Sequence, residues 1–60
     1  MNWNELKKLA VRHGFVFVKH GGRHDEYYNP KTKVSIQIER HWGQEVRSGL
    51  ANRLKKQIGV

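Results

Sequence analysis

His24 follows a glycine pair, Gly21 and Gly22, and stands at the start of a short run of charged and aromatic residues. An unperturbed imidazole has a pKa of about 6.5, so it can give or take a proton near neutral pH. RNA carries its own nucleophile, the 2′-hydroxyl. Its cleavage needs a base for that proton, an acid for the 5′-oxygen and positive charge for the phosphorane. We therefore predict that His24 is the general base or acid of an RNA-cleaving site; the alternative is a solvated strand residue.

The neighbours of His24 are candidates for supporting roles. Arg23 carries a planar guanidinium suited to phosphate, and it can stabilise negative charge if the glycine turn bends it toward His24. Asp25 could orient the imidazole from the next position, or Tyr28 could donate a hydrogen bond to it. Glu26 shares the His24 face of an ideal strand and could also orient the imidazole. The sequence leaves these alternatives open.

The remaining histidines are weaker candidates. His13 ends the first predicted helix, where a cation is favoured by the helix dipole. His20 could reach RNA phosphate or could be an ordinary surface residue. His41, next to Arg40, could contact RNA or a protein partner. We predict no metal site and no cofactor, because the chain has no cysteine and no closely spaced pair of ligands of the kind that zinc sites use.

The charge of the chain indicates its partner. Twelve Lys and Arg against five Asp and Glu give a net charge of +7 over 60 residues, which is typical of a nucleic-acid binder. A membrane partner would need a basic amphipathic helix with an exposed apolar face, whereas the apolar stripes here are expected to face a core. An acidic protein partner is also possible. The residues predicted to contact RNA, unless they simply face solvent, are Lys31, Lys33, Arg40, His41, Arg53, Lys55 and Lys56.

The apolar periodicity predicts the elements that position these residues. A helix is expected over residues 2–13, with Asn2 and Glu5 as a capping box and Gly14 just beyond its end. A second helix should end at Gly59, with Ser48 as its N-cap or with a start nearer residue 45. Between the helices, alternation and turn residues predict strands over 15–18, 24–28 and 33–39.

These elements predict an α+β fold, α-β-β-β-α, in which a three-stranded antiparallel sheet carries both helices on one face. We expect one domain, residues 1–60, with a small core. Trp3 should be buried, Trp42 should cover the core or stack on a base, and Tyr27 and Tyr28 should point to opposite faces. No apolar run is long enough to span a membrane and no signal peptide is evident, so a soluble cytoplasmic protein is expected.

Several motifs, in this order, resemble the HicA family of mRNA-interferase toxins, whose fold is similar to the double-stranded-RNA-binding domain. The resemblance spans nearly the whole chain and depends on the helix exit at 6–14, the Gly22-Arg23-His24-Asp25 turn with Tyr27 behind it, Arg40-His41, and the ending 49–60. Many relatives read G-S-H-H where this chain reads G-R-H-D.

The resemblance implies a toxin that cleaves mRNA without the ribosome and is held inactive by a HicB-type antitoxin bound over its active surface. The position that matches the essential histidine of the family is His24. In such a fold, the loop at 31–33 and the last helix reach phosphate and 2′-hydroxyls. Two alternatives remain: a non-catalytic RNA-binding module, and a protein that acts mainly through contact with an acidic antitoxin.

Overall fold

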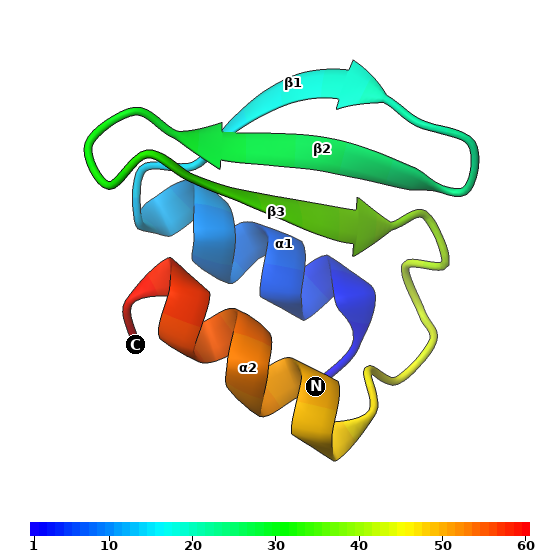
Figure 1. Ribbon diagram of the computed structural model, residues 1–60. Helices are drawn as coiled ribbons and strands as arrows, with labels where there is room; N and C mark the ends of the chain where they lie inside the picture. Colours follow the sequence, from blue (N-terminus) through cyan, green and yellow to red (C-terminus); the bar gives the residue numbers. More distant parts are fainter.

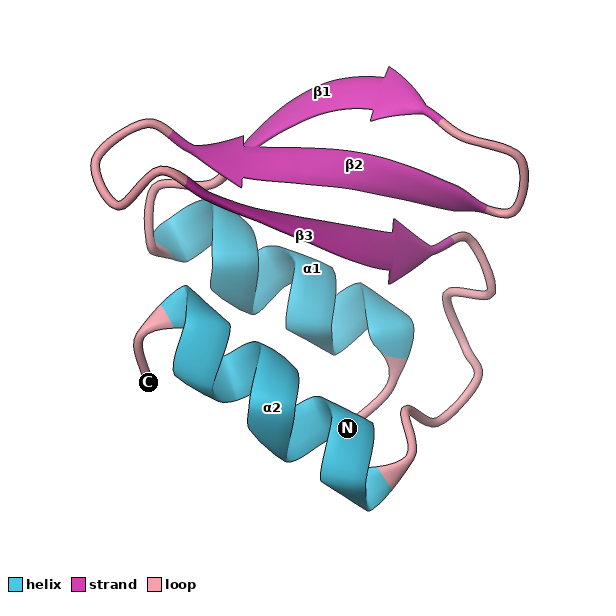
Figure 2. Cartoon of the chain, viewed as in Figure 1, coloured by secondary structure: helices cyan, strands magenta, loops and turns pink.

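A computed structural model describes residues 1–60. The elements follow the order α1 (Trp3–Arg12), β1 (Val16–His20), β2 (His24–Asn29), β3 (Val34–Glu39) and α2 (Ser48–Ile58). The strands form one antiparallel sheet in the order β1-β2-β3, and both helices lie on the same side of it (Figures 1 and 2). The predicted α-β-β-β-α fold is confirmed.

Helix α1 has the predicted ends. The Asn2 side chain accepts a hydrogen bond from the Glu5 amide at 2.8 Å, and the Glu5 carboxylate accepts one from the Asn2 amide at 2.9 Å. This is the reciprocal capping box, which satisfies two amides that the helix leaves unpaired. At the other end His13 is the C-cap and Gly14 has a φ of 94°, a conformation that favours glycine.

Helix α2 differs from the prediction at its start. Arg47 occupies the N-cap position and makes no side-chain capping bond, whereas Ser48 is already helical. The prediction that Ser48 is the N-cap is therefore wrong by one residue. The buried Val46 and Ala51 lie on either side of this start. Gly59 ends the helix with a φ of 105°, as predicted.

Strand β2 separates two sets of side chains. Asp25, Tyr27 and Asn29 are buried, whereas His24 and Tyr28 alternate with them and are half-buried on the other face. Tyr27 and Tyr28 thus point to opposite faces, as predicted.

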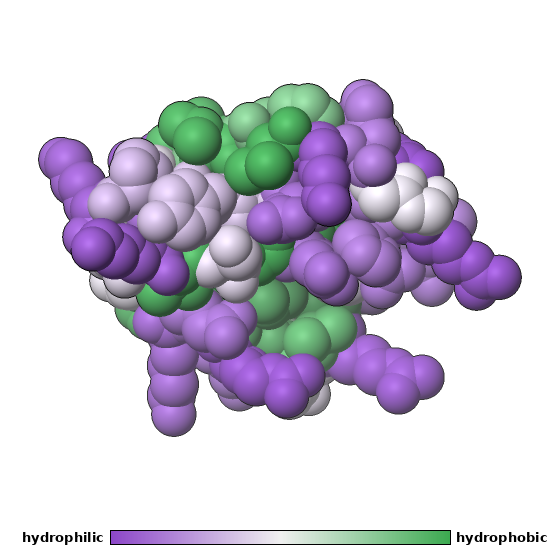
Figure 3. Space-filling model, turned by 45° about the horizontal axis from the view of Figure 1, so that its top comes forward, coloured by the Kyte–Doolittle hydropathy of each residue, from purple (hydrophilic) through white to green (hydrophobic).

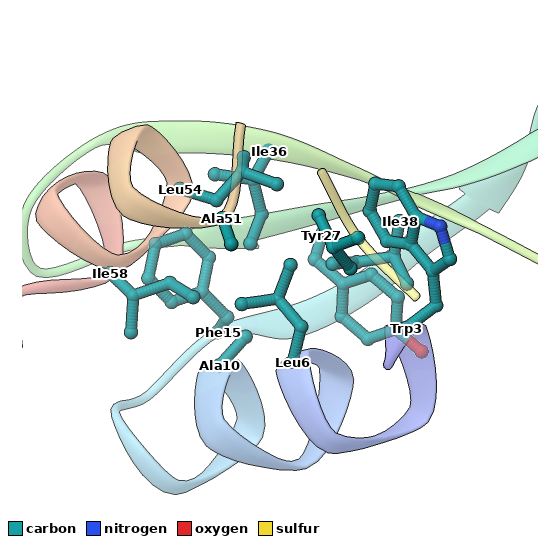
Figure 4. Packing of buried hydrophobic residues seen from close by; sticks show 11 residues of the cluster. Trp3, Leu6, Ala10, Phe15, Tyr27, Ile36, Ile38, Ala51, Leu54 and Ile58 are labelled. Carbon is teal, nitrogen blue, oxygen red and sulfur yellow. The ribbon is translucent and has the colours of Figure 1, made fainter. Parts of the chain in front are cut away.

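The core lies between the sheet and the two helices and contains 11 buried residues, which Figure 4 draws as sticks. Trp3 is one of them, as predicted, and Phe15 is buried just before β1 begins. Trp42 is half-buried against this cluster, and the Lys7 ammonium lies 4.8 Å from the centre of its ring. The prediction that Trp42 covers the core is confirmed.

Strand β1 lies at the edge of the sheet, beyond the part that the helices cover. Val16, Phe17 and Val18 are each about half exposed, at 52%, 47% and 48%. The apolar stripes of the two helices face the core as expected, whereas these three side chains of β1 do not. No helix of the protein is long and apolar enough to cross a membrane.

Candidate active site

One groove of the molecule follows β3, an edge strand of the sheet, and is lined by residues of β2, β3 and α2. Its volume is about 530 Å³. The strands contribute His24, Glu26 and Glu39, and α2 contributes Arg53 and Gln57. A proton-transfer group, two carboxylates and a guanidinium therefore line one surface.

The register of the sheet places His24 beside carboxylates. His24 pairs with Glu39 across β2 and β3, and Glu26 lies two residues along the same face. Directly opposite residues of antiparallel strands have Cα atoms about 4.5–5.5 Å apart. The structure thus adds Glu39 to the candidate site, a residue that sequence analysis missed. The length of the turn between β2 and β3 could have identified Glu39, because it fixes the register of the two strands and so the residue that faces His24.

Gly21 allows the backbone to close tightly around His24. The Gly21 amide donates a hydrogen bond to the His24 carbonyl at 2.7 Å. A Cβ atom at position 21 would lie 2.9 Å from that carbonyl oxygen and 3.4 Å from two atoms of the His24 ring. At Gly22 a Cβ would meet nothing. The first glycine, and not the second, is the one that this close approach requires.

Arg40 closes the turn from the other side. Its Nη1 donates to the Gly21 carbonyl at 3.2 Å and to the His24 carbonyl at 3.4 Å, and its Nη2 donates to the Gly22 carbonyl at 2.6 Å. Nη1 also contacts the carboxylate of Asp25 at 2.8 Å. The guanidinium therefore connects the backbone of the turn to a buried anion. Its predicted contact with RNA stays a prediction.

Asp25 faces the helix side of the sheet and is only 4% exposed. Its Oδ1 accepts hydrogen bonds from Arg40 and from Nδ1 of His20, the latter at 2.7 Å. Burial raises the pKa of Asp25, but the hydrogen bonds and positive charges of His20 and Arg40 outweigh it, so this pKa lies below its ordinary value. His24 points to the opposite face, so the structure does not bring this carboxylate to its imidazole.

One comparison with known proteins assigns the chain to a family. The family model described as the HicA toxin of bacterial toxin-antitoxin systems matches residues 3–60. The chain belongs to the HicA toxin family. Comparisons with curated proteins and with solved structures gave no match. Membership in the HicA family identifies the chain as a toxin of a toxin-antitoxin pair.

The other predicted supporting residues of this HicA toxin lie at different distances from His24. Arg23 is exposed in the turn, and its carbonyl accepts a bond from the Arg40 amide at 3.4 Å. Tyr28 shares the His24 face of β2 but lies four residues further on, or about 13 Å along the strand. Neither side chain makes a hydrogen bond to the His24 ring.

The predicted RNA contacts fall into three groups. Arg53 lines the groove with His24. Lys31 and Lys33 are exposed in the turn at the far end of β2, and Lys33 has a φ of 60°. The remaining cations follow the end of β3 or lie on α2: Arg40, His41, Lys55 and Lys56. No three potential metal-ligating side chains cluster in this HicA chain.

Proposed function

We propose that this HicA-family toxin is an endoribonuclease that cleaves mRNA with His24 as a general acid or base. The observation that supports the proposal is the position of the imidazole. It lies in a groove with a carboxylate directly opposite on the neighbouring strand and with the guanidinium of Arg53, from α2, in the same lining.

The chemistry needs no group beyond these side chains. A base removes the proton of the 2′-hydroxyl, and the 2′-oxygen attacks phosphorus. The bond from phosphorus to the 5′-oxygen breaks, and an acid protonates that oxygen. The products are a 2′,3′-cyclic phosphate and a 5′-hydroxyl. We assign one proton transfer to His24 and the other to Glu39, and we assign to Arg53 the stabilisation of charge on the phosphorane.

The same proposal covers the partners and the place of action. The substrate is mRNA in the cytoplasm, and the protein that neutralises the toxin is a HicB-type antitoxin. Lys31 and Lys33 lie on a separate exposed turn and can bind phosphate away from the groove. Because these lysines can bind RNA without the groove, they favour one alternative function, a module that binds RNA without cutting it.

The test is cleavage of a labelled single-stranded RNA in excess EDTA. The matched substrate carries 2′-deoxynucleotides throughout. The variants are His24→Ala and, as a control, His13→Ala, which removes an exposed histidine from the end of α1. We expect cutting of the RNA alone, lost in His24→Ala and kept in His13→Ala. A folded wild type that binds RNA without cutting it would overturn the proposal in favour of the binding module.

A further inference from the structure

Three consecutive apolar residues of β1 form an exposed surface, which we call the β1 patch: Val16, Phe17 and Val18. In the space-filling view, hydrophobic side chains gather along the top of the molecule, where β1 runs (Figure 3). Of the other exposed large apolar residues, Val11 lies on α1, and Met1 and Val60 lie outside the helices and strands. The β1 patch is thus the one place where exposed apolar residues are contiguous in a strand, and such patches mark interaction sites.

The backbone of β1 is also open to a partner. The sheet order is β1-β2-β3, so β1 pairs with β2 on one side and with nothing on the other. The register shifts between Phe17 and Lys19, which leaves Val18 as a bulge. Phe17 lies opposite the buried Tyr27, and Val16 lies opposite Tyr28, so apolar side chains point to both faces of this edge. An open edge strand is a template for an added strand.

The charges around the β1 patch select the kind of partner. Lys19, His20 and Arg23 follow it along the chain, and Lys31 and Lys33 lie in the turn near the start of β1. Two carboxylates lie near these cations: Asp25 is buried with Arg40 and His20, and Glu26 lies opposite Lys19 in the register. Arg23, Lys31 and Lys33 form no ion pair, so they leave positive charge at both ends of the patch.

We propose that β1 binds an extended, acidic segment of a partner protein, which joins the sheet as a fourth strand. Backbone hydrogen bonds and burial of the β1 patch supply affinity, and acidic residues at both ends of the segment pair with the flanking cations. A second copy of this chain fits less well, because each copy carries a charge of +7. The proposal does not depend on whether His24 cleaves RNA.

The experiment is a titration of the ¹⁵N-labelled protein with a synthetic peptide of alternating Val and Thr flanked by Glu at both ends. One control peptide replaces Glu by Lys, and another carries N-methyl groups on alternate amides and cannot pair along one edge. We expect saturable shifts of the amides of residues 16–20 with the acidic peptide. Both control peptides should bind at least about tenfold more weakly than the acidic peptide.

The matched protein variants are Val18→Glu and Val60→Glu, which place the same charge at two half-exposed valines. Val18→Glu should weaken binding of the acidic peptide about tenfold, because the new carboxylate repels the carboxylates of the peptide. Val60→Glu should leave binding of the peptide unchanged. Equal effects of the two variants, absence of binding, or shifts confined to the groove residues would overturn the proposal. So would sedimentation showing that the free protein dimerises and that Val18→Glu restores the monomer, since the occupant would then be a second copy.

Discussion

His20 and His24 stand at the two ends of one glycine turn, and their surroundings differ. His20 faces the helix side of the sheet, where its Nδ1 lies 2.7 Å from the buried carboxylate of Asp25. Because an ionised carboxylate can only accept, Nδ1 carries the proton and Nε2 is left free. The His24 ring lies on the other face, in the groove, and makes no hydrogen bond within the protein.

The comparison shows how a turn can give two identical side chains different roles. Asp25 and Arg40 hold His20 and the carbonyls of the turn, so this side of the hairpin is fixed by charge and hydrogen bonds. On the other side His24 keeps both ring nitrogens available for a substrate. We infer that His20 belongs to the support of the turn and His24 to the chemistry.

The largest expected effect separates the two histidines directly. His24→Ala should lower RNA cleavage by about 10²–10⁴-fold, the range for loss of a general acid or base. His20→Ala should keep cleavage within about tenfold of the wild type, because Asp25 retains Arg40 as its partner. Single-turnover cleavage rates at matched RNA saturation measure both. Equal losses in the two variants would contradict the division of roles.

Removal of Arg40 breaks the fixed side of the turn. Arg40→Met should lower the free energy of unfolding by about 2–4 kcal/mol, since it leaves Asp25 buried with only His20 as a partner. The loss stays below that of a fully buried pair because the Arg40 side chain is 36% exposed. Urea unfolding followed by far-UV circular dichroism gives the value. Arg40→Lys should recover part of the lost free energy of unfolding. If Arg40→Met left the free energy of unfolding unchanged, the ion pair would not support the turn.

The two glycines between the histidines provide a smaller, paired test. Gly21→Ala should destabilise the protein by about 1–3 kcal/mol, because its Cβ would lie 2.9 Å from the His24 carbonyl oxygen and force the turn to shift. Gly22→Ala should change stability by about 0.5 kcal/mol or less, since its Cβ meets open space. Thermal unfolding of the two variants at equal concentration measures and compares their stabilities. If Gly22→Ala proved the more harmful, the close approach at Gly21 would not be what shapes the turn.

The smallest expected effect is a dependence of stability on pH. The pKa of Asp25 in the folded protein is lowered from its model-compound value of 3.8, so the unfolded chain binds the proton more readily. The stabilisation is therefore complete above about pH 4 and is lost as pH falls through the lower folded pKa. Asp25→Asn should flatten the stability profile over this acid range. The control is Glu45→Gln, which removes an exposed carboxylate elsewhere on the surface.

Local patterns predicted the elements, and pairings between distant residues were harder to predict. The capping box at Asn2, the glycine ends of the helices and the alternation along 34–39 depend on neighbours in sequence, so each was predictable. The start of α2 differs from the prediction by one residue, because Arg47 occupies the N-cap position without a side-chain bond and Ser48 is already helical.

The candidate site was predictable only in part for the same reason. His24 was identified from a local motif together with a family resemblance. Glu39 and Arg53 reach its groove through strand register and helix packing, which the sequence does not state. The bonds from Arg40 to the turn join residues up to 19 positions apart, and nothing in the charge pattern distinguishes such an arginine from one that faces solvent. The exposure of β1 follows from how far the helices extend over the sheet.

The position of α2 also sets a time order for the formation of the groove. Ala51, Leu54 and Ile58 of this helix complete the core, and Arg53 supplies the only cation on the helix wall of the groove. The β-hairpins join neighbouring segments and can form early, whereas the groove exists only after α2 has docked against β3. Until α2 docks, the groove lacks Arg53 and the other side chains of the helix layer. The surface that we propose acts on RNA therefore exists only in the fully folded domain.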